Sequence, residues 1–397
     1  MSKINFQTLV LARENAGLSL KDAARKLNFK DTKNRTAVER LELIEQGKLI
    51  PSKAVLEKMA ALYRRNLLLF YIETIPKPSP SLVDYRKIYH QTTKIEEFWL
   101  STLIRDIQGR QIILREAMID NEVAETIEFI ESLHPPISIE KLSEEIKKII
   151  GFNIKEFRRF RNTREAFQYL RELIERKGVY VLLVTDLGNH FTKIMPEVFR
   201  GFTLVDKIAP FIVINNNDAR SALSFTLLHE LVHLFLGQSS ISNGNLKLED
   251  EKICNDVASS ILLNDGEVWD KFIQVSTTYP SQQLINDIEN FSSARNISST
   301  MVAYRLLILG IISSHEYEQL SSVFKERWIK TKIEQRNKQR SSVGGPDYNI
   351  IKRNQAGHGL VKSVKSYLSN GTLSLPDASK ILGVSSRSVH TLIEVNS

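Results

Sequence analysis

Apolar and polar residues alternate at helical spacing through the first 75 residues, and glycines separate the apolar groups. Apolar positions three and four residues apart lie on one face of a helix, so the pattern predicts a small helical bundle. Gly17 and Gly47 are suited to end two of the helices, and Ser19 is suited to cap the helix that follows it. The predicted helices cover residues 9–17, 20–27, 36–46 and 52–63.

The rest of the chain predicts helices mixed with a few strands. Proline lacks an amide hydrogen and has a fixed φ, so the segment Pro76–Ser81 predicts an extended linker. Downstream, helical spacing covers residues 94–130 and 163–176, and short apolar runs typical of strands cover residues 179–184, 203–205 and 211–214. The fold expected is α+β, mostly α, with a small twisted sheet packed beside helices.

One predicted helix carries polar side chains in apolar surroundings. Residues 222–236 are mostly apolar and end at Gly237, which predicts a buried helix, yet they include His229, Glu230 and His233. Histidines four residues apart lie on one face, about 6 Å apart along the axis, and can bind one cation. The pattern H-E-x-x-H is typical of zinc metallopeptidases, in which the glutamate takes a proton from water. A histidine pair hydrogen-bonded in a core is the alternative.

A catalytic zinc site needs a third protein ligand and leaves one position for water. The acidic run before the apolar segment 253–263 offers Glu251 as the preferred ligand and Glu249 as the reserve, although these charges also favour a helix N-terminus. Asn255, one turn after Glu251, could hydrogen-bond the outer nitrogen of a ligating histidine. Cys254 is a softer ligand by chemistry, but a lone cysteine in an apolar segment more often belongs to a core.

Several segments around this helix resemble the ImmA/IrrE family of zinc metallopeptidases. They are Arg200–Leu204, Pro210–Asn215, Phe225–Leu234 and Glu251-x-x-Cys254-Asn255-x-x-Ala258. The resemblance implies that His229, His233 and Glu251 bind Zn2+ and that Glu230 is the catalytic base. The chain departs from the family pattern at Cys254, Val257 and Asn264, where alanine, phenylalanine and proline are usual. None of these departures affects an expected ligand.

Length and composition are those expected of a multidomain intracellular protein. The 397 residues exceed what one core usually supports, and a single cysteine excludes an intramolecular disulfide. The sequence has no signal-peptide pattern and no apolar run of membrane-spanning length. We therefore expect a cytoplasmic location.

Charge is distributed unevenly along the chain. Residues 1–75 hold 14 lysines and arginines against 8 acidic residues, and residues 325–397 hold 13 against 5, although the whole chain has a net charge of only +8. The middle of the chain is therefore net acidic. Basic ends favour binding of a polyanion, and ordinary scatter of charge on solvated helices is the alternative.

The helices of residues 1–75 resemble the XRE (Cro/C1-type) repressor domain, in which the second helix supports the third in the major groove of DNA. The resemblance makes residues 36–46 the recognition helix. This helix also carries three glutamates, which leaves a protein-docking role open. The side chains expected to face DNA are Lys33, Asn34, Arg35, Thr36 and Arg40.

Two later segments have a similar sequence pattern, which predicts short helices separated by a turn. Residues 291–309 predict a helical hairpin that completes the catalytic domain. A glycine-rich hinge at residues 344–348 precedes residues 373–393, which predict a second helix-turn-helix. Longer members of the ImmA/IrrE family carry the same hinge and tail. In this tail, Ser385, Arg387 and His390 could contact DNA or a partner protein.

These patterns divide the chain into four parts: a helix-turn-helix domain (1–75), a linker and helical spacer (76–150), a metallopeptidase domain (151–324) and a basic helical domain (325–397). The family resemblance implies a DNA-binding zinc endopeptidase that cleaves a repressor or antitoxin and so controls stress-response or mobile-element genes. The expected partners are that substrate, DNA and a second copy of the chain, without a membrane. A transcriptional regulator or antitoxin-like module with a structural or inactive metal site is the alternative.

Overall fold

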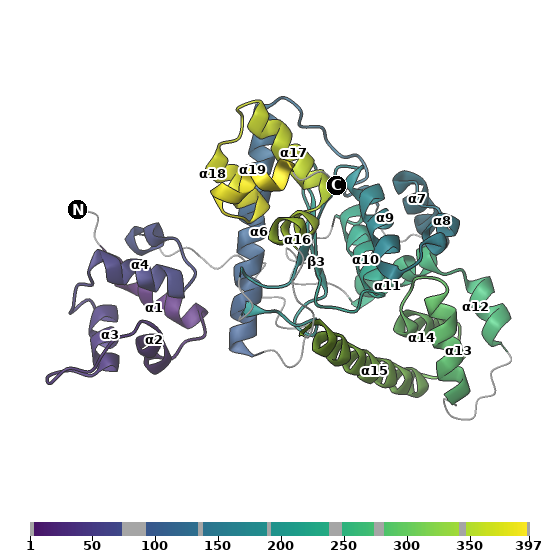
Figure 1. The fold of residues 1–397 in the computed structure, drawn as a ribbon, viewed down its shortest axis with the longest axis horizontal. Helices are drawn as coiled ribbons and strands as arrows, with labels where there is room; N and C mark the ends of the chain where they lie inside the picture. Colours follow the sequence, from purple (N-terminus) through teal and green to yellow (C-terminus); the bar gives the residue numbers. More distant parts are fainter. Residues whose placement is uncertain are drawn as a thin grey trace. The chain divides into compact units, whose positions relative to one another are not determined.

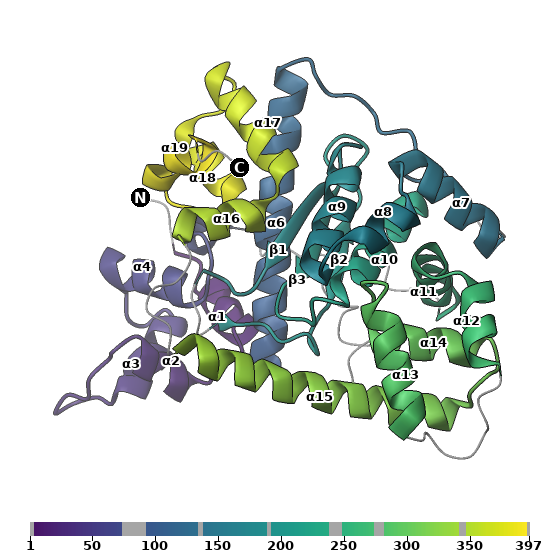
Figure 2. The same ribbon diagram turned by 45° about the vertical axis from the view of Figure 1, so that its right-hand side comes forward.

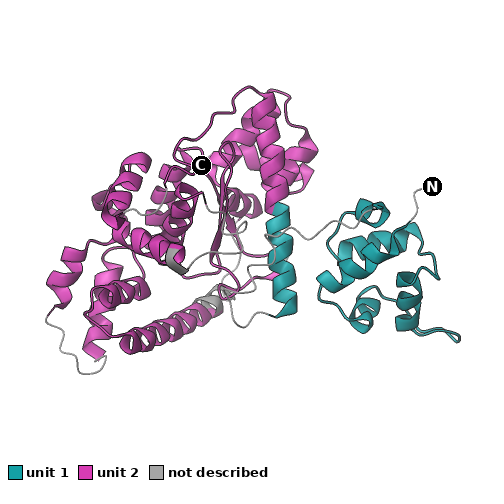
Figure 3. Ribbon diagram, turned by 180° about the vertical axis from the view of Figure 1, so that it is seen from behind, with its two compact units in different colours: residues 1–106 teal, residues 107–397 magenta. Residues whose placement is uncertain are grey.

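The computed structural model describes residues 4–73, 93–133, 138–188, 192–237, 248–273, 282–340 and 347–394. The chain divides into two compact units, Met1–Asp106 and Ile107–Ser397 (Figure 3). The predicted linker and residues 344–346 of the predicted hinge lie outside the described ranges. Helices predominate and there is one small sheet in the described part, which confirms the predicted α+β, mostly α class.

The first unit is a bundle of helices around its own apolar core. The helices are α1 (Phe6–Asn15), α2 (Leu20–Lys26), α3 (Ala37–Glu45), α4 (Lys53–Leu62), the 3-10 helix η1 (Leu67–Tyr71) and the first part of α6 (Lys94–Asp120). Leu9, Leu41 and Met59 are completely buried in the core. The side chain of Ser19 accepts a hydrogen bond at the start of α2, as predicted. The four helices predicted in this unit are confirmed.

A buried ion pair connects α1 to α3. Nε and Nη2 of Arg13 donate to the two carboxylate oxygens of Glu45 at 2.8 and 3.0 Å. The two side chains are only 10% and 6% exposed. At the start of α3, Thr36 and Glu39 form a reciprocal capping box. Two of the three glutamates on this helix therefore stabilise the unit itself.

The second unit is built on a three-stranded sheet. Its central strand β3 (Phe211–Asn215) pairs in parallel with β1 (Tyr180–Val184) and antiparallel with β2 (Gly201–Leu204). Every residue of β3 is buried, because strands and helices cover it on all sides. The three predicted strands are confirmed, and β2 begins two residues before its expected start.

Helices cover both sides of this sheet. The helices between residues 138 and 340 are α7 (Ile139–Ile150), α8 (Ile154–Arg159), α9 (Thr163–Glu175), α10 (Leu223–Phe235), α11 (Leu248–Leu262), α12 (Asp265–Phe272), α13 (Gln282–Ser293), α14 (Ser299–Ile308) and α15 (Ser314–Arg340). The C-terminal helices are α16 (Tyr348–Ala356), α17 (His358–Ser369), α18 (Leu375–Leu382) and α19 (Ser386–Glu394). In Figures 1 and 2, α9 and α10 lie on one side of the sheet and α16 lies on the other. Within the described ranges, none of the helices combines the length and apolar character that a membrane span requires.

Helix α6 ends ten residues before its predicted end at residue 130. Glu122 has a left-handed φ of 55°, a conformation that stops a helix. The chain then passes the C-terminal end of α10, where the amide of Glu131 donates to the carbonyl oxygen of Leu234 at 3.0 Å. The amide of Leu133 likewise donates to the carbonyl oxygen of Phe235 at 3.1 Å, so the segment after α6 supplies hydrogen-bond donors to the last turn of α10.

The C-terminal helices pack against β1 and α9 around a buried arginine. Arg171 of α9 is 1% exposed. Its guanidinium donates to Glu175 at 3.0 Å and to the carbonyl oxygen of Asn354 at 2.6 Å. The amide of Gly359 donates to the other oxygen of Glu175 at 3.0 Å. Gly357, between α16 and α17, has φ 88°, and a Cβ atom there would collide with Glu175, so only glycine fits.

Candidate metal centre

Helix α10 carries its polar residues into the interior of the second unit. It packs against β2, β3, α9 and α11. His233 is 1% exposed and Glu230 is 4% exposed. The helix forms in spite of these groups because its remaining positions are almost entirely apolar and fill the core on every face. A buried helix of this kind needs a specific partner for each polar side chain.

The two histidines of α10 and Glu251 of α11 meet at one point. The two Nε2 atoms are 3.2 Å apart, and the carboxylate oxygens of Glu251 lie 3.3 Å from Nε2 of His229 and 3.5 Å from Nε2 of His233. Ligand atoms bound to zinc at its usual distance and tetrahedral angle are separated by about 3.3 Å. One oxygen of Glu251 faces each histidine, Oε2 toward His229 and Oε1 toward His233, and each of the three separations is close to that between two ligands of a tetrahedral zinc ion. Among the described residues, these side chains form a group able to hold a metal ion.

The charge on Glu251 is also suited to binding a cation. Burial by itself would raise the pKa of Glu251, but hydrogen bonding and charge interactions with His229 and His233 hold this pKa well below its ordinary value. Burial lowers the pKa of His229, but its contacts with Glu251, Glu230 and Asn255 outweigh this effect and leave the pKa raised. Glu251 is therefore ionised at neutral pH, which is the state in which a carboxylate binds metal.

Glu230 is held beside this group by β2. The hydroxyl of Thr203 donates to Oε2 of Glu230, at 2.8 Å, and lies 3.0 Å from the backbone carbonyl oxygen of the same residue. A Cβ atom at Gly201 would lie 2.8 Å from Oε1 of Glu230, so the absence of a side chain leaves room for the carboxylate. Burial raises the pKa of Glu230, although His233, His229 and Thr203 oppose the rise. A raised pKa makes a carboxylate a better proton acceptor.

The outer nitrogens of the two histidines have different surroundings. Sγ of Cys254 lies 3.6 Å from Nδ1 of His233, in the core. Burial raises the pKa of the Cys254 thiol well above its usual value, so it stays protonated and is not one of the converging ligands. Asn255 contributes to the raised pKa of His229, yet Nδ1 of His229 is buried and has no hydrogen-bond partner in the described part of the chain. Asn255 therefore interacts with His229 as expected, but this interaction is not a hydrogen bond of normal geometry to Nδ1.

Sequence reasoning found the converging side chains but not those that hold them. Gly201 and Thr203 lie far from α10 in the chain and act through the packing of β2 against α10. Their only sequence signal was their place in a segment resembling the metallopeptidase family. Cys254 was recognised as a core residue, but its contact with His233 was not expected. The side chain of the reserve ligand Glu249 lies outside the described residues.

The residues expected to face DNA lie in the first unit, around the start of α3. Lys33, Asn34 and Arg35 are exposed in the connection between α2 and α3, and Thr36 caps α3. The guanidinium of Arg40 lies over the ring of Phe29, with Cζ 4.5 Å from the ring centre. In the second unit, the three residues proposed on the tail, Ser385, Arg387 and His390, are exposed at α19.

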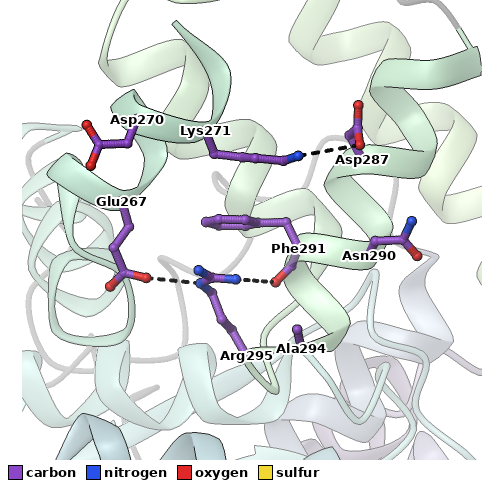
Figure 4. Close-up of a pocket in the computed structure, with 8 residues that line it drawn as sticks. All are labelled: Glu267, Asp270, Lys271, Asp287, Asn290, Phe291, Ala294 and Arg295. Carbon is purple, nitrogen blue, oxygen red and sulfur yellow. Dashed lines mark hydrogen bonds and ion pairs between the residues drawn. The ribbon is translucent and has the colours of Figure 1, made fainter.

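A surface groove of about 560 Å3 lies between α12 and α13, away from the metal ligands (Figure 4). Arg295 lies over the ring of Phe291 and donates to Glu267 at 3.1 Å. Lys271 faces Asp287 at 3.7 Å. Four of the five charged side chains of the groove therefore form ion pairs with one another, and among the described residues these side chains do not form a second group of converging ligands.

Comparison with known proteins supports the family resemblance around the metal centre. Residues 186–307 match the family model Peptidase_M78, described as the IrrE N-terminal-like domain. The matched segment contains His229, Glu230, His233 and Glu251. This region of the chain is thus similar to a metallopeptidase family. Comparison with curated proteins found no match, and neither did comparison with solved structures.

Proposed function

We propose that the chain is a zinc-dependent metalloendopeptidase that cleaves a regulatory protein, and that its helix-turn-helix segments bring it to DNA or to a partner protein. One observation carries the catalytic part. The Nε2 atoms of His229 and His233 lie 3.2 Å apart beside a buried glutamate, and one oxygen of Glu251 lies 3.3 Å from the first and the other 3.5 Å from the second. This spacing suits tetrahedral zinc and leaves the fourth position for water or substrate. The family match at residues 186–307 supports the same reaction class.

The proposed chemistry divides between the metal and Glu230. When bound, zinc supplies Lewis acidity, which polarises a carbonyl group and lowers the pKa of water. Glu230 accepts a proton from the attacking water and later delivers it to the amine that leaves. Thr203 keeps the carboxylate in place by donating to Oε2, at 2.8 Å. The low exposure of Glu230, 4%, keeps bulk water from competing for its proton.

The regulatory part rests on the ends of the chain. The first unit has the helices of a helix-turn-helix domain and an excess of basic residues, with Lys33, Asn34, Arg35, Thr36 and Arg40 as proposed DNA contacts. A peptidase combined with such a module suits cleavage of a repressor or antitoxin near its operator. α18 and α19 form a second helix-turn-helix that could contact DNA or a partner.

The Glu230→Gln variant tests the catalytic proposal. It keeps the ligands and the size of the side chain but removes the base, so we expect zinc binding to persist while hydrolysis falls by roughly 100-fold to 10,000-fold. Cells producing the native chain or the variant are compared by proteomics for new protein N-termini. Glu326→Gln, at an exposed position of α15, is the matched control and should behave like the native chain.

Two results would contradict the proposal. A purified chain that stays metal-free after zinc loading has no such site. Identical sets of N-termini with the native chain and Glu230→Gln, together with full zinc occupancy, would favour the alternative of a regulator with a structural metal site. A structural site needs no base and shows no hydrolysis in either form.

A further inference from the structure

The connection between α2 and α3 is longer than a helix-turn-helix requires. It spans residues 27–36, whereas this motif usually has a turn of about three or four residues. Thr32 and Arg35 form an antiparallel bridge in which the Thr32 amide donates to the Arg35 carbonyl oxygen at 2.8 Å. Lys33 and Asn34 form the tip between them. We call residues 30–35 the basic hairpin; in Figures 1 and 2 it projects from the end of α3.

The basic hairpin is anchored at its base, although its side chains are exposed. The carboxylate of Asp31 accepts a hydrogen bond from the Ala37 amide at 2.6 Å, and the amide of Phe29 donates to the Ala24 carbonyl oxygen. Arg40 covers the ring of Phe29. The hairpin thus has a defined position at the N-terminal end of α3. An anchored loop loses less conformational entropy on binding than a free one.

Positive charge gathers on this hairpin and on the neighbouring α2. Residues 31–36 are all exposed, as are Lys30 and, on α2, Lys21, Arg25 and Lys26. Asp22 neutralises part of this charge through its ion pair with Arg25 at 2.9 Å. Asp31 is engaged at the start of α3. Lys30, Lys33 and Arg35 therefore present three cations from one projecting element.

The outward face of α3 has the opposite character. Its exposed positions are Glu39, Glu42 and Gln46. Glu39 is used in the capping box, and Glu42 accepts a hydrogen bond from Gln46 at 3.2 Å. Both carboxylates therefore interact within α3 and its N-cap. A helix with this face is repelled by phosphate groups, so it cannot supply the electrostatic part of DNA affinity.

We propose that the basic hairpin binds the phosphate backbone of duplex DNA and supplies most of the affinity of the first unit, without reading bases. This inference rests on the DNA-binding part of the proposed function and assigns it to a different element from the recognition helix. Phosphate contacts carry no sequence information, so duplexes of unrelated sequence bind with similar affinity through this element. Lys33 at the tip and Arg35 beside it make the closest contacts, while Lys30 adds to the local positive potential.

The test uses the full-length chain and a fluorescent duplex of mixed sequence, with binding followed by anisotropy at several salt concentrations. The native chain should bind in a salt-dependent manner. In Lys33→Gln/Arg35→Gln, the loss of two phosphate contacts should lower affinity on the order of tenfold or more near 0.1 M salt and reduce the slope of log K against log salt by about 2. Circular dichroism shows whether the variant keeps its helices.

Lys53→Gln/Lys58→Gln is the matched control, since it removes the same charge from exposed positions of α4 in the same unit. It should change the affinity by less than about threefold, as expected for distant exposed charges. Equal losses in the control and the hairpin variant would overturn the inference, and so would an unchanged slope in the hairpin variant. If the native chain binds no duplex, the DNA-binding part of the proposed function fails as well. The catalytic part of the proposed function is tested separately, by Glu230→Gln.

Discussion

Helices α10 and α3 both carry charged residues at spacings of three and four, but they use them differently. In α10, Glu230 and His233 are buried and the side chain of His229 is only 14% exposed, so water is largely excluded and each polar group needs a partner. In α3, Glu39 and Glu42 point to solvent and only the third glutamate is buried. Spacing alone therefore does not distinguish a chemical site from a solvated face. Burial decides between them, because charge interactions are much stronger where water is excluded.

Removing the buried ion pair of α3 should have the largest effect on stability. Arg13→Met leaves the carboxylate of Glu45 buried without its partner, which costs about 3 kcal/mol in the unfolding free energy of the first unit. Hydrogen exchange followed by mass spectrometry should show faster exchange in α1 and α3 and no change in α10. Arg13→Met/Glu45→Leu should recover most of the loss. Unchanged exchange in Arg13→Met would mean that the α3 pair behaves like an exposed one.

Loss of the third ligand should affect metal binding next most strongly. Glu251→Gln replaces a charged ligand by a neutral amide, so zinc affinity should fall by more than about 100-fold. Competition with a coloured chelator measures this change. Glu249→Gln is the control, and its affinity should stay close to that of the native chain. If the two results were reversed, Glu249 and not Glu251 would be the ligand.

Crowding Glu230 should reduce turnover and leave the metal in place. In Gly201→Ala, the new Cβ atom lies 2.8 Å from Oε1 of Glu230 and displaces the carboxylate. A displacement of about 1 Å can cost on the order of 100-fold in rate. Cleavage of the regulatory substrate should fall, with zinc affinity unchanged. Gly109→Ala, where the Cβ atom meets no neighbour within 4 Å, should have no effect. Full activity in Gly201→Ala would show that Glu230 needs no fixed position.

The smallest effect is expected on the exposed face of α3. Glu42→Gln removes a negative charge that repels phosphate, so affinity for duplex DNA should rise by about two- to fivefold and the gain should vanish at high salt. The anisotropy assay described for the basic hairpin measures it. A fall in affinity would indicate instead that Glu42 contacts a base or a basic partner.

Prediction from sequence succeeded where the structure depends on neighbouring residues. The four helices of the first unit, the three strands and the metal-site helix all follow from periodicity and end signals within short windows. The end of α6 was predicted too late, because the left-handed turn at Glu122 carries no glycine signal. The extended connection before α3 contains Lys33 and Arg35, which were expected near DNA, but its hairpin geometry was not foreseen.

By itself, the sequence determined that His229 and His233 share one face of a buried helix with Glu230 beside them, since the helical period is a local property of the backbone. Only the tertiary structure decided that Glu251 lies 3.3 Å from His229. It also decided that Gly201 leaves room for the carboxylate of Glu230 and Thr203 donates to it, and that the C-terminal helices pack around Arg171. These contacts join residues far apart in the chain. They depend on how whole elements pack, which no local pattern encodes.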